Sequence, residues 1–193
     1  MSKYDTIMGA EEQFAREVAL RVIYLKPQTA WYYLIPGMFI FDFLRRGSII
    51  RKYTETFMFP RKLALEAARS LGANQSRTAI DPHLDSEIKT WLTAHHLESQ
   101  DLALAQKATV DLLVAHYARL LQSEGQTYYD LIENAYPSRE DFEDHLRQIT
   151  AAENKVDQAI LERVGDKPEI LQKLQLEAQQ VQNRRQKILE DIF

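Results

Sequence analysis

Five histidines are the side chains of this 193-residue sequence with the clearest capacity to bind a metal ion. They are His83, His95, His96, His116 and His145. A di-metal carboxylate site in a helical bundle places an acidic residue three positions before a ligating histidine, on the same helix face. The residues at those positions are Ile80, Leu92, Thr93, Leu113 and Phe142, and none of them is acidic. The sequence therefore predicts no metal site of this kind, and we expect no cofactor.

The adjacent histidines His95 and His96, with Glu98 close by, form the densest cluster of potential ligands. Neighbouring residues of a helix point about 100° apart, so two adjacent imidazoles rarely reach one metal ion. The simpler interpretation is a helix end, where histidines interact favourably with the helix dipole. His116, beside Tyr117, is interpreted as a buried histidine that forms a hydrogen bond.

The short motifs of common enzyme classes are absent from the sequence. It contains no glycine-rich phosphate loop, dinucleotide fingerprint, nucleophile elbow or paired-histidine zinc motif. It also contains no cysteine, which excludes thiolate ligands and cysteine nucleophiles and indicates a reducing, cytoplasmic setting. We favour a non-enzymatic role. A helical enzyme or ligand-binding protein that uses His95, His96 or His116 is the weaker alternative.

Charge is distributed unevenly along the chain. Residues 1–72 carry a net charge of +4 and residues 73–193 a net charge of −8, within a total of −4. The acidic part argues against a protein that coats nucleic acid, whereas the basic part can meet a phosphate-bearing partner. The first residues lack the apolar run of a signal peptide.

The elements that must position these side chains are predicted to be helices, because apolar residues recur at helical spacing along most of the chain. We expect an all-α helical bundle with a long C-terminal antiparallel helical hairpin. The predicted parts are an N-terminal helical region (1–72), a bundle region (73–137) and the hairpin (138–193), with a single domain as the alternative. The predicted helices are one that ends at Pro27, one that runs from Pro60 to a left-handed cap at Gly72, and others near 82–96, 100–123, 128–136, 139–164 and from Pro168 to Phe193.

The final two predicted helices share a heptad rhythm that is typical of a packed helix pair. The sequence Gly165 to Pro168 would reverse the chain between them. The alternative is that they are simply two helices of a globular bundle. Self-association through this hairpin is a further possibility. The apolar residues predicted at the hairpin interface are Ile149, Val156, Leu171, Leu174, Val181 and Ile188.

Residues 28–62 break the amphipathic pattern. From Pro27 to Phe41 the sequence carries no charge and is rich in aromatic residues. A helix that is apolar on every side must be buried in protein or in lipid. This run of about 15 residues, interrupted by Pro36 and Gly37, is shorter than the roughly 20 residues that span a bilayer. Three interpretations follow: the buried centre of the bundle, an interfacial membrane contact, or a contact with a groove on a partner protein.

Basic residues follow this aromatic run, an order that is typical of segments at the lipid headgroup level. We expect a non-enzymatic scaffold or adaptor that associates through residues 28–62 with an anionic membrane surface, at the inner face of the membrane, or with a membrane-protein partner. The alternative is a soluble, self-associating bundle. No specific contact with nucleic acid is predicted, because no recognisable RNA or DNA module surrounds the basic residues. The residues predicted to make the membrane or partner contact are Trp31, Tyr32, Tyr33, Phe39, Phe41, Arg45, Arg46, Arg51 and Lys52.

Overall fold

A computed structural model of the chain describes residues 2–24, 38–73, 75–165 and 168–193. Within these ranges the chain forms seven helices and no strand, so the predicted all-α helical bundle is confirmed. The helices are α1 (Lys3–Tyr24), α2 (Met38–Gly72), α3 (Arg77–Ala94), α4 (Gln100–Gln122), α5 (Tyr128–Ala135), α6 (Arg139–Val164) and α7 (Pro168–Ile192).

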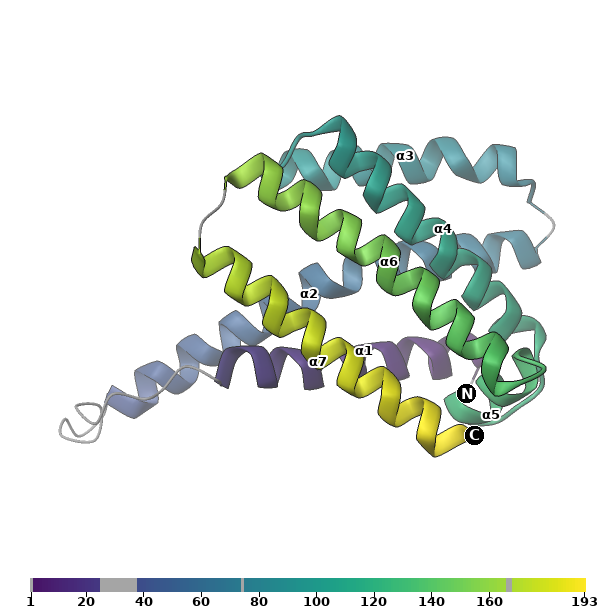
Figure 1. Cartoon of the computed structure of the whole chain (residues 1–193). Coiled ribbons are helices and arrows are strands. Elements are labelled where there is room, and N and C mark those ends of the chain that lie inside the picture. The colour runs from purple at the N-terminus through teal and green to yellow at the C-terminus, as the bar shows by residue number, and fades with distance from the viewer. Residues whose placement is uncertain (1, 25–37, 74, 166–167) are drawn as a thin grey trace.

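Helix α4 lies at the centre of the bundle and packs against α1, α2, α3, α5 and α6 (Figure 1). Its buried apolar residues recur at steps of three and four, which places them on one broad face. Burial of this face accounts for the central position of the helix, since removing apolar surface from water is the main force that stabilises a fold. These residues are Leu102, Val110, Leu113, Val114, Tyr117 and Leu120.

Side-chain caps fix the starts of three helices close to the predicted positions. The Ser99 hydroxyl accepts a hydrogen bond from the Leu102 amide at the start of α4, and Ser138 caps α6 in the same way. Thr127 and Asp130 form a reciprocal capping box at the start of α5. A cap of this kind is typically worth about 1 kcal/mol of helix stability.

Two predicted boundaries are wrong. Helix α3 begins at Arg77 rather than Pro82, because Ser76 in an extended conformation takes the position before the helix and Pro82 is accommodated inside it. The Asp81 carboxylate accepts a hydrogen bond from the Arg77 side chain at 2.7 Å instead of capping a helix start. Gly72 does not adopt the predicted left-handed conformation; it lies within the last turn of α2.

Helix α2 differs most from its prediction, because it begins at Met38 and continues through Pro60. Proline has no amide hydrogen and leaves this turn of the helix one hydrogen bond short. In the same turn, the Arg61 guanidinium donates to the Phe57 carbonyl oxygen at 3.1 Å. The N-terminal part of α2 extends outward beyond the bundle (Figure 1).

The C-terminal helices α6 and α7 run antiparallel and are joined through Gly165, whose φ of 80° favours glycine (Figure 1). Helix α7 packs against α6, but it also packs against α1 and α5. The hairpin is therefore part of the bundle rather than an isolated arm.

Candidate functional site

The predicted contact segment falls partly outside the described residues. Trp31, Tyr32 and Tyr33 lie outside them, and so do the side chains of Phe39, Phe41, Arg45 and Arg46, although the backbone of these four belongs to α2. The remaining two predicted contact residues, Arg51 and Lys52, are exposed on α2.

Along α2 the described side chains change from exposed to packed. Ile49 is 44% exposed, and the exposed Lys52 lies three residues further along the same face of the helix. One turn later, the Tyr53 ring stacks on Phe57, and Phe57 stacks on Phe14 of α1, each pair with ring centroids 6.0 Å apart. Met58 is fully buried. The α2 side chains therefore become buried from about Tyr53 onward, whereas the side chains of residues 47–52 are exposed or half-buried.

The predicted hairpin residues are distributed over several environments. Ile149, Val181 and Ile188 are buried within the main hydrophobic core, where α1 and α5 also contribute. Val156 and Leu174 are half-buried, and Leu171 is 42% exposed. Self-association through this face stays a prediction.

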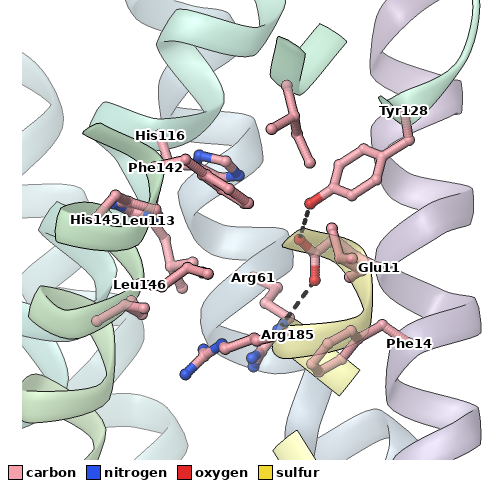
Figure 2. Close-up of a pocket in the computed structure, with 13 residues that line it drawn as sticks. Glu11, Phe14, Arg61, Leu113, His116, Tyr128, Phe142, His145, Leu146 and Arg185 are labelled. Carbon is pink, nitrogen blue, oxygen red and sulfur yellow. Dashed lines mark hydrogen bonds and ion pairs between the residues drawn. The ribbon is translucent and has the colours of Figure 1, made fainter. Parts of the chain in front are cut away.

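The centre of the bundle contains a network of charged side chains that we did not predict. The Arg61 guanidinium on α2 donates to Glu11 of α1 at 3.1 Å and to Glu153 of α6 at 3.4 Å. Arg185 of α7 donates to both carboxylate oxygens of Glu153, at 2.7 and 2.9 Å. Figure 2 shows the Glu11 carboxylate between Arg61 and the Tyr128 hydroxyl, which donates to it at 3.2 Å. The network thus connects five helices.

Opposite charges offset the free-energy cost of burying the ionised side chains of this network. Arg61 is 6% exposed, and taking an ion out of water costs several kcal/mol unless an opposite charge compensates for it. Burial opposes the charge of Arg61, but Glu11 and Glu153 outweigh that effect and raise its pKa. Burial would likewise raise the pKa of Glu153, but Arg185 and Arg61 lower it. Arg61 and Glu153 therefore stay charged at neutral pH.

A cavity of about 50 Å³ adjoins the network and is lined by Glu11, Arg61, His116, His145 and Arg185, among other residues (Figure 2). One water molecule needs roughly 10–15 Å³ of such space, so the cavity has room for a few water molecules. Pockets for organic ligands are typically several hundred Å³. The cavity supports hydration of the network and not the binding of an organic substrate.

Two histidines, His116 and His145, stack beside this cavity with ring centroids 4.6 Å apart. His116 is buried and forms a hydrogen bond, as expected; its partner is the Tyr136 hydroxyl, 2.7 Å from Nδ1. Burial, followed by the nearby charge of Arg185, lowers the pKa of His145 to about 4. Burial also lowers the pKa of His116 well below its usual value. Both rings are neutral at pH 7.

We expect a His145→Phe variant to lose less stability than the wild type when the pH falls from 7 to 5. In the wild type the unfolded chain takes up a proton near pH 6.5, whereas folded His145 does so only near pH 4, so acid favours unfolding across this interval. Phenylalanine removes the titration and keeps a ring among aromatic neighbours. Urea unfolding at both pH values measures the effect, and His83→Phe at an exposed position is the control. An equal pH dependence in the wild type and His145→Phe would contradict the expectation.

A second polar cluster contains Asp157 of α6, Glu177 of α7 and Tyr53 of α2. Burial, with the charges of Glu177 and Glu153, raises the pKa of Asp157 to about 7. Burial also raises the pKa of Glu177. The Tyr53 hydroxyl is buried, and its pKa is raised by burial and by Glu177. The cluster brings two acidic groups together, and the charge of Arg61 offsets the effect of burial on the pKa of Glu177 only in part.

A larger depression, of about 790 Å³, lies between α1 and α2. It is lined by apolar residues from both helices and by basic residues that include Arg16 and Arg51. Its lining on α2 begins at Gly47, in the part of the helix that precedes the buried residues. We call it the α1–α2 groove. Apart from Arg51, sequence reasoning did not single out the residues that line it.

Neither a metal centre nor a membrane-spanning helix is found in the ranges that the structure describes. No three His, Cys, Asp or Glu side chains there come together as metal ligands would. None of the helices in those ranges is both long and apolar enough to cross a bilayer.

Comparison of the chain with protein-family models, with curated protein sequences and with solved structures found no match.

Proposed function

We propose that the protein is a helical adaptor that attaches to an anionic membrane surface through residues 28–62. The main support is the course of α2, which extends beyond the bundle and carries the exposed side chains Ile49, Arg51 and Lys52. An apolar side chain with a cation three residues further along the same helix face, as for Ile49 and Lys52, suits the boundary between lipid headgroups and acyl chains. The uncharged aromatic run that precedes this part of the sequence supports the same location.

The charge distribution agrees with attachment through the extended part of α2 alone. Each Lys or Arg near an anionic membrane contributes about 1 kcal/mol of attraction. The net charge of −8 on residues 73–193 disfavours contact between the rest of the bundle and the same surface. The acidic bundle would then face away from the membrane and be accessible to other proteins, as an adaptor requires.

We expect simultaneous charge reversal of Arg45, Arg46, Arg51 and Lys52 to glutamate to weaken binding to vesicles that contain phosphatidylserine by at least about 100-fold, because four attractive charges become repulsive. Co-sedimentation with such vesicles, at low and at high salt, measures the binding. The far-ultraviolet circular dichroism spectrum should be unchanged, since the exposed part of α2 lies outside the core.

The matched control reverses four exposed lysines on other helices and alters the net charge by the same amount. These are Lys89, Lys155, Lys173 and Lys187. The control should bind much more tightly than the α2 variant. Equal binding by the two variants would refute attachment through residues 28–62.

A further inference from the structure

The α1–α2 groove combines an apolar floor with a charged rim. Leu20 of α1 and Ile50 and Met58 of α2 supply its large apolar side chains. Its volume of about 790 Å³ lies within the range of roughly 300–1,000 Å³ that is usual for small-molecule pockets. The groove is therefore large enough for a ligand of lipid size, unlike the cavity beside the histidines.

The charges on the rim favour an anion near the end of the groove that opens toward the α2 extension. Three basic residues (Arg16, Arg51 and Lys62) and two acidic residues line the groove. Lys62 is paired with Glu12 at 3.4 Å. That pair lies at the far end, because α1 and α2 run antiparallel and Leu20 is two helical turns beyond Glu12. Glu55 is the second acidic residue, so the lining residues that the structure describes carry a net charge of +1.

Gly47 offers a position from which the groove can be obstructed. It lines the groove on α2, and a Cβ atom added to it would meet no other atom within 4 Å. Any larger side chain at this position would extend into open space without displacing backbone.

We propose that the α1–α2 groove binds a single molecule of an anionic phospholipid. Its acyl chain would lie along the half-buried side chains of Leu20 and Ile50, and its phosphate would face Arg16 and Arg51. This inference rests on the proposed function, because the groove opens on the same end of α2 that would meet the membrane. The proposed function requires only electrostatic attraction between the protein and the membrane surface. The inference adds a defined binding site for one lipid molecule at the same end of α2.

The test uses dihexanoyl phosphatidylserine below its critical micelle concentration, titrated into the full chain by isothermal calorimetry. We expect saturable binding by the wild type and at least tenfold weaker binding of dihexanoyl phosphatidylcholine, whose headgroup has no net charge. Glycerophosphoserine, which lacks acyl chains, should also bind at least tenfold more weakly. Equal binding of glycerophosphoserine and the lipid would overturn the proposal, because it would reveal a phosphate site without a role for the apolar floor.

Two substitutions test the location. Gly47→Trp should fill the groove and weaken binding of the short-chain lipid at least tenfold, whereas Gly47→Ala, which also removes the glycine, should bind as the wild type does. Arg16→Glu lies outside residues 28–62 and should weaken binding by a similar factor through charge alone. Wild-type affinity in both Gly47→Trp and Arg16→Glu would overturn the groove as the site.

Vesicle binding separates this inference from the proposed function. A wild-type chain that binds anionic vesicles but not the short-chain lipid would refute the groove and leave the attachment intact. A chain that binds the short-chain lipid but no vesicle would refute the attachment and leave the groove intact.

Discussion

An Arg61→Met variant is expected to unfold with a free energy about 3–5 kcal/mol lower than that of the wild-type chain. Methionine fits the space of the aliphatic stem, but it cannot donate to Glu11 or to Glu153. Glu11 is 8% exposed and would be left with only the Tyr128 hydroxyl as a partner. Most of the expected loss comes from this uncompensated buried carboxylate rather than from the missing contacts.

The neighbouring residue offers a matched control. Lys62 pairs with Glu12 at 3.4 Å, and each of the two residues directly follows a member of the Arg61–Glu11 pair in the sequence. Both side chains are about half exposed. Exposed ion pairs are worth about 0–1 kcal/mol, so Lys62→Met should change stability by no more than that. Urea unfolding followed by circular dichroism measures both variants under the same conditions.

A double variant identifies the source of the loss. Adding Glu11→Gln to Arg61→Met removes the buried charge that lost its partner, so the double variant should be more stable than Arg61→Met alone. Equal stability of Arg61→Met and Lys62→Met would show that the central network does not contribute to holding the bundle together.

An Asp157→Asn variant is expected to be more stable than the wild type at pH 8 by about 1–2 kcal/mol and closer to it at pH 4. Folding raises the pKa of Asp157 from near 3.8 to about 7. Between these pH values the unfolded chain releases a proton that the folded chain keeps, so rising pH lowers the stability of the wild type. The expected gain is smaller than the full shift implies, because solvent reaches part of this side chain.

The comparison must be made as a difference between variant and wild type. His116 and His145 contribute a pH dependence of opposite sign, because acid favours the unfolded state at these two positions. Subtracting the free energy of unfolding of the wild type from that of the variant at each pH removes the contribution of the histidines and leaves that of Asp157. Asp85→Asn, at an exposed position on α3, is the control. A gain for Asp157→Asn that is the same at pH 4 and pH 8 would contradict this account of the acidic cluster.

Local signals in the sequence predicted much of the fold. The capping residues Ser99, Thr127 and Ser138 act within one helical turn, which is why α4, α5 and α6 begin where the sequence indicated. Proline was less reliable as a boundary. Pro60 and Pro82 both lie inside helices, because packing on either side stabilises the helix by more than one missing hydrogen bond costs.

The buried network was missed because its members are far apart in sequence, although each left a local trace. Glu11 lies on the apolar stripe of α1, four residues after Ile7 and three before Phe14, both of which are buried. Arg185 occupies a seam position of α7. Its side chain is 7% exposed and donates to Glu153. A charged residue on an apolar stripe indicates a partner on another helix without identifying it.

The placement of residues 28–62 needed long-range information for a different reason. Their composition is compatible with a buried helix, a lipid contact or a protein contact, since all three environments favour apolar side chains. Figure 1 places the N-terminal turns of α2 outside the bundle. The identity of what they touch depends on the vesicle and lipid experiments.

The arrangement of the central ion network also bears on biosynthesis. Its members come from α1, α2, α6 and α7, so Arg61 and Glu153 are brought together with Arg185 only after α7 has left the ribosome. Before that point a nascent chain can form helices, but closing its interior would bury an unbalanced charge. We therefore expect truncated products that lack α7 to stay loosely packed and accessible to proteases, and the closed bundle to form only after residue 185 has been translated.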